Sequence, residues 1–396
     1  MKRVILSAAA LMIGTIAFAQ TNDSDVVQSG TANEATVVQA GNINVSKVLQ
    51  QGGSENEATV TQTGVNNNSK VEQAGSQPNR VQRNLATIVQ TGNDNVSFVR
   101  SQDGEENDNT TTQVGFVNDA YVKQIGSRNA STIDQQGDDN EARSTVTFSD
   151  GNTSTISQDG NGNVSRTAQT FGPARGDGGG NTSTVTVTGD DNDAFTNQAG
   201  GLNTSTIKQN RDLNLSNVDQ VGDGNTSSID QRSSFNDADV DQNGNDNRST
   251  VIQNESDIAV TSQSGNDNGA RIRQLSRFNK GYITQTGDGN NADVRQFGND
   301  DNLSNLTQDG IGNRSDVEQF GGNNESTITS TGDGNINVVN QGNQSIGNQA
   351  RSFDSDSSII QLGNMNRGTI NQFGNGQIST VTQTGNGNAA TVTQSN

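Results

Sequence analysis

Small, branched and amide side chains alternate with polar residues along most of this chain, in units of eleven residues. From Gln198 a glutamine recurs at every eleventh position as far as Gln253. Each unit has the form Q-x-G-x-x-N-x-(A/S)-x-(V/I)-x-Q, and related runs begin at Gln102 and Gln361. Such self-similarity at a fixed period indicates a repeat protein in which neighbouring units stack on one another.

The parity of the positions within each unit predicts a β-strand with one inward face. Asn, Ala or Ser, Val or Ile, and Gln occupy positions 6, 8, 10 and 12, and side chains two residues apart point to the same side of a strand. The residues between them, such as Thr204, Thr206 and Lys208, are polar and suit a solvated face. Glycine with Asp or Asn at positions 3 to 5 predicts a tight turn. Each unit is therefore a strand followed by a turn.

The regular stretch from Gln198 gives a definite set of structural positions. We expect an inward core ladder at Gln198, Asn203, Ile207, Gln209, Asn214, Val218, Gln220, Asn225, Ile229, Gln231, Asn236, Val240, Gln242, Asn247 and Val251. The expected turn glycines are Gly200, Gly222, Gly244, Gly265 and Gly287. These glycines alternate with other residues, such as Arg211 and Ser233, at the equivalent position of the intervening units. The true repeat is therefore a pair of unequal 11-residue units.

Two strands of one pair can face each other across a thin core and stack on the next pair. Buried amides without partners would cost about 1–3 kcal/mol each. Parallel, in-register layers about 4.8 Å apart remove that cost, because each amide bonds to its copies in the neighbouring layers. The sequence therefore predicts an all-β fold, a β-solenoid of strand-turn-strand layers of about 22 residues, of the cross-β type.

The solenoid is expected to cover residues 28–396, with interruptions. Where the repeat breaks down we expect irregular insertions, near residues 76–86, 142–157, 171–180, 254–262 and 343–358. Phe297, Phe320 and Phe373, each directly after a glutamine, are expected on the outer surface.

The first residues differ from everything after them. Lys2 and Arg3 precede an apolar stretch that ends in Ala17-Phe18-Ala19, which is typical of a secretory signal peptide at residues 1–19. A short segment, residues 20–27, is expected between the cleavage site and the first repeat. The apolar stretch is too short for a membrane helix, and we expect no membrane span in the mature chain.

Composition alone would place this chain among disordered proteins, with 27% hydrophobic residues and a net charge of −20. The repeat argues against disorder, because a disordered chain has no reason to keep Val or Ile in phase with Asn and Gln. Removal of Lys2 and Arg3 leaves 22 basic and 44 acidic residues, so the mature charge is −22 and nucleic acid is not an expected partner. Cysteine is absent, so backbone pairing and stacking must stabilise the exported chain.

The repeat resembles the curlin repeat of the major and minor subunits of curli, the amyloid fibres of bacterial biofilms. The family motif is Q-x-G-x-x-N-x-A-x-x-x-Q, and clear instances are residues 124–135 and 383–394. The resemblance implies export from a Gram-negative-type bacterium through a dedicated outer-membrane channel, and assembly outside the cell on a nucleator subunit. Those subunits carry a longer glycine-rich segment before the first repeat than residues 20–27 provide.

The sequence argues against two other function classes, an enzyme and a calcium-binding β-roll. An enzyme would have to act without histidine or cysteine, and paired acids such as Asp138-Asp139 and Asp190-Asp191 recur at turn positions instead of forming one site. Calcium-binding β-rolls use a nine-residue repeat, whereas this period is eleven. We therefore expect no catalytic residues, no metal and no cofactor. The alternative that stays open is a monomeric extracellular β-solenoid that acts as an adhesin or binding rod.

The expected function is that of a secreted structural subunit, located outside the cell or at its surface. Its partners would be other copies of itself, in a fibre that grows by templated β-stacking and serves biofilm matrix and adhesion. The last repeat reaches Gln394 without a visible cap, and an uncovered solenoid layer can template another chain.

Overall fold

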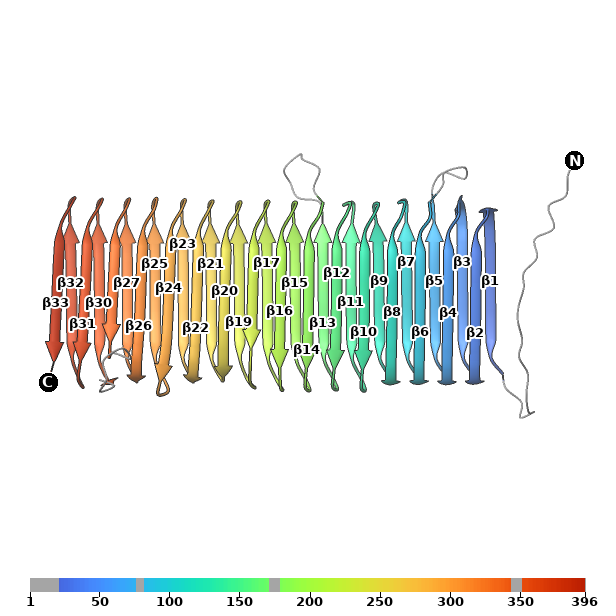
Figure 1. The fold of residues 1–396 in the computed structure, drawn as a ribbon, viewed down its shortest axis with the longest axis horizontal. Coiled ribbons are helices and arrows are strands. Elements are labelled where there is room, and N and C mark those ends of the chain that lie inside the picture. The colour runs from blue at the N-terminus through green and yellow to red at the C-terminus, as the bar shows by residue number, and fades with distance from the viewer. Residues whose placement is uncertain (1–20, 76–81, 171–178, 343–350, 396) are drawn as a thin grey trace, which may run out of the picture. The chain divides into compact units, whose positions relative to one another are not determined.

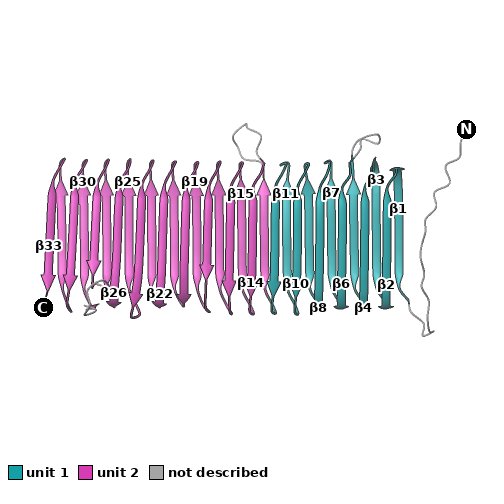
Figure 2. Cartoon of the chain, viewed as in Figure 1, with its two compact units in different colours: residues 1–162 teal, residues 163–396 magenta. Residues whose placement is uncertain are grey.

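The computed structural model describes residues 21–75, 82–170, 179–342 and 351–395. The regular elements in these residues are all β-strands, as the sequence predicts. Within the same residues no helix has the length and apolar character needed to cross a membrane. The chain divides into two compact units, residues 1–162 (unit 1) and 163–396 (unit 2), coloured separately in Figure 2. The expected signal peptide, residues 1–19, lies outside the described residues.

Unit 1 consists of two parallel sheets. In sheet A the strands pair in the order β1 (Asp23–Thr31), β3 (Val45–Ser54), β5 (Asn68–Ala74), β7 (Val96–Gln102), β9 (Asp119–Ile125) and β11 (Glu141–Thr147). In sheet B the order is β2 (Glu34–Asn42), β4 (Glu57–Val65), β6 (Leu85–Asn93), β8 (Asp108–Phe116), β10 (Ala130–Gln136) and β12 (Thr153–Asp159).

Unit 2 has the same two sheets. Its sheet A contains β13 (Val164–Thr170), β15 (Asp193–Ala199), β17 (Leu215–Val221), β19 (Asp237–Asn243), β21 (Ile258–Ser264), β23 (Lys280–Thr286), β25 (Leu303–Asp309), β27 (Glu325–Thr331), β30 (Asp356–Leu362) and β32 (Ile378–Thr384). Its sheet B contains β14 (Thr182–Thr188), β16 (Thr204–Asn210), β18 (Thr226–Gln231), β20 (Arg248–Glu255), β22 (Gly269–Arg277), β24 (Asn291–Gly298), β26 (Arg314–Gly322), β28 (Ile336–Gln341), β31 (Arg367–Phe373) and β33 (Ala389–Ser395). The two-residue strand β29 (Ser352–Phe353) adds to the end of β26.

The register confirms a β-solenoid. Successive strands of the chain alternate between the two sheets, and within each unit the strands of a sheet run side by side (Figure 1). Most paired residues are 22 apart, as Asp193 and Leu215 are, or 23 apart, as Ala130 and Thr153 are. Larger offsets occur in a few layers, such as that between Glu57 and Leu85. One strand of sheet A, one turn, one strand of sheet B and the next turn therefore form one layer.

Alternation of burial along each strand follows from the alternation in the sequence. In β17 the exposed Leu215 is followed by buried Ser216, and Val218 and Gln220 are fully buried. Small and large residues meet across the core, because a side chain added at Gly281 in β23 would meet Ile272 of β22. The core of each unit is thus a single layer of Ala, Ser, Val, Ile, Asn and Gln between two sheets.

The short segment expected at residues 20–27 is wrong, because Asp23–Val27 belongs to β1. Ser24, Val26 and Gln28 pair with Ser46, Val48 and Gln50 of β3. In each 11-residue repeat the strand comes before the glutamine that closes it. A count that starts at Gln28 therefore leaves out the first strand.

Two of the expected irregular insertions are regular strands. Residues 142–157 lie mostly in β11 and β12. Val146 replaces a ladder glutamine there, which breaks the sequence motif, but it still pairs in register with Gln124. Residues 254–262 form the end of β20, a turn and the start of β21, with Asp257 in an asparagine position. The first stretch has one residue more than a 22-residue layer, since Ala130 pairs with Thr153, and the second has one fewer, since Asp237 pairs with Ile258. Both changes fall in turns, so the alternation of inward and outward residues within the strands survives.

The other three expected insertions fall largely outside the described residues, which omit 76–81, 171–178 and 343–350. Regular structure resumes at Leu85 in β6, at Thr182 in β14 and at Ser352 in β29. The expectation that all three aromatics lie on the outer surface is wrong for Phe297 and Phe320, which are 9% and 4% exposed. Their rings pack against each other with centroids 6.4 Å apart, because their strands are neighbours in sheet B.

Candidate functional site

The ladder glutamines form directional chains of hydrogen bonds within each unit. In sheet A of unit 2 the Nε2 of Gln198 donates to Oε1 of Gln220 at 2.9 Å, and Gln220 donates to Gln242 at 2.8 Å. In sheet B, Gln209 donates to Gln231 and Gln231 to Gln253, both at 3.1 Å. Each glutamine thus donates to the layer that follows it in the chain.

The second amide proton of each ladder glutamine ties the two sheets together. Nε2 of Gln220 also donates to the backbone oxygen of Thr204 at 3.1 Å, and Nε2 of Gln231 to that of Leu215 at 2.8 Å. A fully buried amide is thereby satisfied both along the stack and across it, which removes most of the cost of its burial.

The asparagines form a second ladder that runs in the opposite direction. The backbone N and the Nδ2 of Asn203 both donate to Oδ1 of Asn181, at 2.9 and 3.1 Å. Nδ2 of Asn203 also donates to the backbone oxygen of Gly222 at 2.7 Å. Asn203 therefore bonds to the asparagine of the layer before it and to the turn of the layer after it, so every layer has a distinct upper and lower side.

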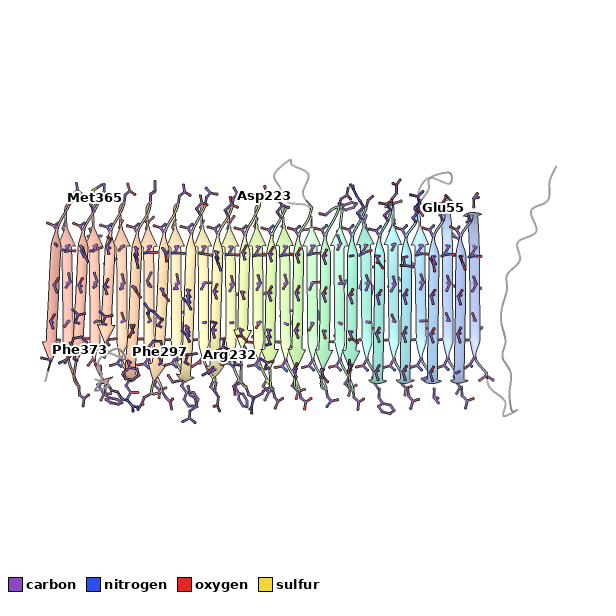
Figure 3. All side chains as sticks on the ribbon, in the orientation of Figure 1. Glu55, Asp223, Arg232, Phe297, Met365 and Phe373 are labelled. Carbon is purple, nitrogen blue, oxygen red and sulfur yellow. The ribbon has the colours of Figure 1, made fainter. Side chains whose placement is uncertain are left out.

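The turn glycines gather at one edge of unit 2, where strands of sheet A lead into strands of sheet B (the glycine edge). Gly200, Gly222, Gly244, Gly265 and Gly287 have φ values from 99° to 130°. In Figure 3 Asp223 and Met365 lie at this edge, and Arg232 lies at the opposite edge. The two edges differ because the two 11-residue repeats that form each layer have different turn residues.

All the core ladder positions expected from the sequence are buried in unit 2. Gln198, Gln209, Gln220, Gln231 and Gln242 are 0% exposed, and the matching asparagines and branched residues are at most 2% exposed. Two residues expected to face solvent, Thr206 and Lys208, are exposed in β16. The structure brings these residues together in columns of period 22, one set in each sheet.

The sequence did not indicate that bulky residues occupy left-handed turn positions. At the opposite edge of unit 2, Leu213, Phe235 and Phe278 have φ values of 59°, 64° and 59°. Each costs about 1–2 kcal/mol in that conformation. The stacked backbone imposes the turn geometry, and the local sequence does not.

One glutamine of the unit 1 ladder lacks its partners. Gln124 is 0% exposed, and neither its Nε2 nor its Oε1 makes a hydrogen bond in the described structure. Its neighbours in sheet A are Ser101 on one side and Val146 on the other, and neither can continue the chain of amides. The ladder is interrupted there at the expense of stability.

Replacement of Gln124 by leucine is expected to stabilise the chain by about 1–3 kcal/mol, because it removes two unsatisfied buried atoms at nearly constant volume. Gln113→Leu in the same unit is the matched control, since Gln113 donates to Gln135 at 2.9 Å and accepts from Gln90 at 2.8 Å. That change is expected to destabilise by a similar amount. Guanidinium titrations followed by circular dichroism measure the free energy of unfolding of both variants. If the two changes shift it in the same direction, Gln124 is not an unsatisfied amide.

A carboxylate replaces one amide of the asparagine ladder. Asp257 is 0% exposed, and its Oδ1 accepts from the backbone N and the Nδ2 of Asn279, at 2.9 and 3.1 Å. Its own backbone N donates to Oδ1 of Asn236 at 3.2 Å, as an asparagine would at this place. Burial raises the pKa of Asp257 to about 7, with a small further contribution from the charge of Asp300.

No group of three or more His, Cys, Asp or Glu side chains in the described residues could hold a metal ion. The outermost described layers leave inward residues of the ladders partly exposed. In β2 the inward Ala35, Val37 and Gln39 are partly exposed, whereas Ala58, Val60 and Gln62 one layer further in are 0% exposed. In β33 the inward Val392 and Gln394 are likewise partly exposed.

Comparison with known families gives one match. The curlin-associated repeat matches residues 48–75, 104–137, 118–143, 265–298, 300–332 and 363–395. The matched segments lie in both units and follow the strand-turn-strand layers. A search of curated proteins finds no match to the chain.

Proposed function

The chain belongs to the curlin repeat family, and from this premise we propose that it is a secreted structural subunit of curli-like amyloid fibres. Copies add to the fibre by templated β-stacking outside the cell, where the fibre contributes to biofilm matrix and surface adhesion. Its role is structural and involves no catalysis. By resemblance to the family, a nucleator subunit and an outer-membrane secretion channel are its further partners.

The observation that carries this proposal is the match between the first and last described layers. The inward residues of β33 are Ala390, Val392 and Gln394, and those of β2 are Ala35, Val37 and Gln39. Stacking β2 of one copy on β33 of another places Ala on Ala, Val on Val and Gln on Gln, as β2 itself pairs with β4. The inward Ser, Val and Gln of β32 match those of β1 in the same way.

The direction of the ladders also fits such a contact. In the described residues Nε2 of Gln394 donates only to the backbone oxygen of Ile378, at 3.1 Å, which leaves one proton for a further acceptor. Oε1 of Gln39 accepts no bond from another described residue, although its Nε2 donates to Gln62 at 2.8 Å. A head-to-tail contact pairs this donor with this acceptor, and the half-exposed core of both layers becomes buried.

Seeded growth tests the proposal. We expect the purified chain from Gln20 to Asn396 to show thioflavin-T fluorescence after a lag that preformed seeds abolish, with fibre reflections near 4.8 and 10 Å. A chain that folds at once into a stable β-rich monomer and ignores seeds refutes the proposal and supports the monomeric adhesin or binding rod.

A matched pair of variants on β33 tests the stacking surface. Val392→Lys is expected to slow seeded elongation more than tenfold, because a charge buried without a partner costs several kcal/mol and 1.4 kcal/mol is a factor of ten. Thr391→Lys adds the same charge to the exposed side of the same strand and is expected to change elongation less than about twofold. Elongation rates follow from thioflavin-T traces at fixed seed concentration, and equal slowing by the two variants argues against this surface.

A further inference from the structure

Unit 2 has a concentration of arginine on the outer face of sheet B. We call Arg248, Arg271, Arg273, Arg295 and Arg314, on β20, β22, β24 and β26, the arginine patch. Arg273 and Arg295 are direct neighbours across two strands, and Arg271 lies beside Asp293. This is a local excess of positive charge on a chain with a net charge of −20.

The carboxylates within this face are gathered on a single arginine. Arg295 pairs with Asp316 at 2.7 Å, Glu318 at 3.4 Å and Asp293 at 3.5 Å. The other four arginines of the patch form no ion pair with a described residue. Between Arg271 and Arg314 lies a hollow of about 320 Å³, also lined by Asn291, Asp293, Ser315 and Asp316. The face therefore has unsatisfied cations and room for incoming carboxylates.

The outer face of sheet A in the same unit carries the opposite charge. We call Asp219, Asp237, Asp239 and Asp241, on β17 and β19, the aspartate patch. Asp219 and Asp241 are direct neighbours, and β17, β19 and β21 contain no lysine or arginine. Burial, followed by the charge of Asp239, raises the pKa of Asp237, and burial with Asp219 and Asp239 raises that of Asp241. The negative charge of this face is therefore uncompensated.

We propose that the arginine patch of one copy docks on the aspartate patch of a second copy, so that neighbouring fibres associate side by side through opposite faces of unit 2. Both faces are parallel sheets with strands about 4.8 Å apart, and sheets of this kind pack about 10 Å apart. The aspartate patch lies on β17 and β19 and the arginine patch on β20 to β26, so the docked copies are staggered along the stack. Fibre bundling by this contact rests on the proposed function, whereas the contact between two copies does not.

Multiplicity makes such a contact effective. Single exposed ion pairs are weak and are screened by salt beyond about 10 Å at 0.1 M ionic strength. A fibre presents one patch of each sign for every copy it contains, so many weak contacts act together along two fibres. Bundling is therefore expected to be steeply dependent on salt.

Charge reversal of each patch tests the proposal. In the variant Arg271→Asp/Arg273→Asp both faces of unit 2 are acidic. In Asp239→Lys/Asp241→Lys the aspartate patch has no net charge, while the arginine patch stays basic. We expect preformed fibres of either variant alone to show at least a fivefold loss of lateral contacts at 50 mM NaCl, counted by negative-stain electron microscopy and by turbidity. We expect a 1:1 mixture of the two variant fibres to bundle again, because acidic faces then meet basic ones.

The controls separate this proposal from stacking. Lys208→Asp/Lys280→Asp makes the same change in net charge outside both patches and is expected to leave bundling within about twofold of the natural chain. Seeded elongation of every variant is measured in parallel and is expected to be unchanged. If the chain stays monomeric, the same pairing is read as dimerisation at low salt by analytical ultracentrifugation.

Two results overturn the proposal. One is that the mixture of reversed variants stays as dispersed as each variant alone. The other is that the natural fibres bundle only when an anionic polysaccharide such as alginate is added, with the arginine variant affected and the aspartate variant not. That outcome assigns the arginine patch to an anionic polymer and not to a second copy.

Discussion

The Asp257→Asn chain is expected to be more stable than the natural chain by about 4 kcal/mol above pH 7, and equally stable near pH 4. The pKa of Asp257 rises from an ordinary value of 3.8 to about 7 in the folded chain, which is about three units at 1.36 kcal/mol each. Between pH 4 and 7 the folded chain holds a proton that the unfolded chain has released. The stability of the natural chain therefore falls as pH rises through this window, by up to about 1.4 kcal/mol per unit.

Neutral groups surround this carboxyl. Its oxygens accept from Asn279 and from the backbone N of Asn254. The charge of Asp300, which is itself paired with Arg277, adds only a little to the rise of its pKa. A protonated Asp257 resembles the asparagine that the column holds elsewhere, whereas the ionised form places a charge among stacked amides. Low pH thus favours the regular ladder.

Burial also raises the pKa of Asp119, Asp237 and Asp293, so other groups add to the pH dependence of stability. The effect of Asp257 is therefore measured by guanidinium titrations from pH 4 to 8, as the difference in unfolding free energy between the natural and Asp257→Asn chains. Asn214→Asp, two layers away in the same column, is the mirror variant and should introduce a second loss of stability over the same window. Parallel curves for the natural and Asp257→Asn chains would exclude a buried titrating carboxyl at this place.

The period and parity of the sequence were sufficient for the architecture. Inward and outward positions follow from side-chain alternation alone, so the columns through Gln220, Asn225 and Ile229 could be placed without coordinates. Regular layers were missed where one inward residue is exchanged, as at Val146 and Asp257. The substitution breaks the sequence motif at these places. The strand still forms, because the neighbouring strands hold its backbone in register.

The surface features could not be predicted in the same way. The arginine patch combines residues about 22 positions apart, such as Arg273 and Arg295, which become neighbours only once the register is fixed. Reading the sequence in columns of 22 would have revealed it, whereas reading along each strand did not. The strained turns at Leu213 and Phe235 had no sequence signal, since bulky residues do not favour that conformation.

Gly222→Ala is expected to destabilise the chain by roughly 3–5 kcal/mol, the sum of backbone strain and overpacking. Gly222 has φ 111°, and an added Cβ would overlap the backbone oxygen of Gly244 in the next layer. That oxygen accepts from Nδ2 of Asn225 at 2.7 Å, so it has no freedom to move away. The glycine column therefore fixes the spacing at which one layer stacks on the next.

Gly289→Ala is the matched control at the same edge, because Gly289 has φ 66° and no atom lies within 4 Å of its added Cβ. Only the left-handed conformation opposes this change, at about 1–2 kcal/mol. Guanidinium midpoints give both costs, and seeded elongation shows whether Gly222→Ala also impairs stacking. Equal costs at the two positions would mean that the layers can separate to admit a methyl group. In that case the amide ladders, and not the glycine column, would set the layer spacing on which templated growth depends.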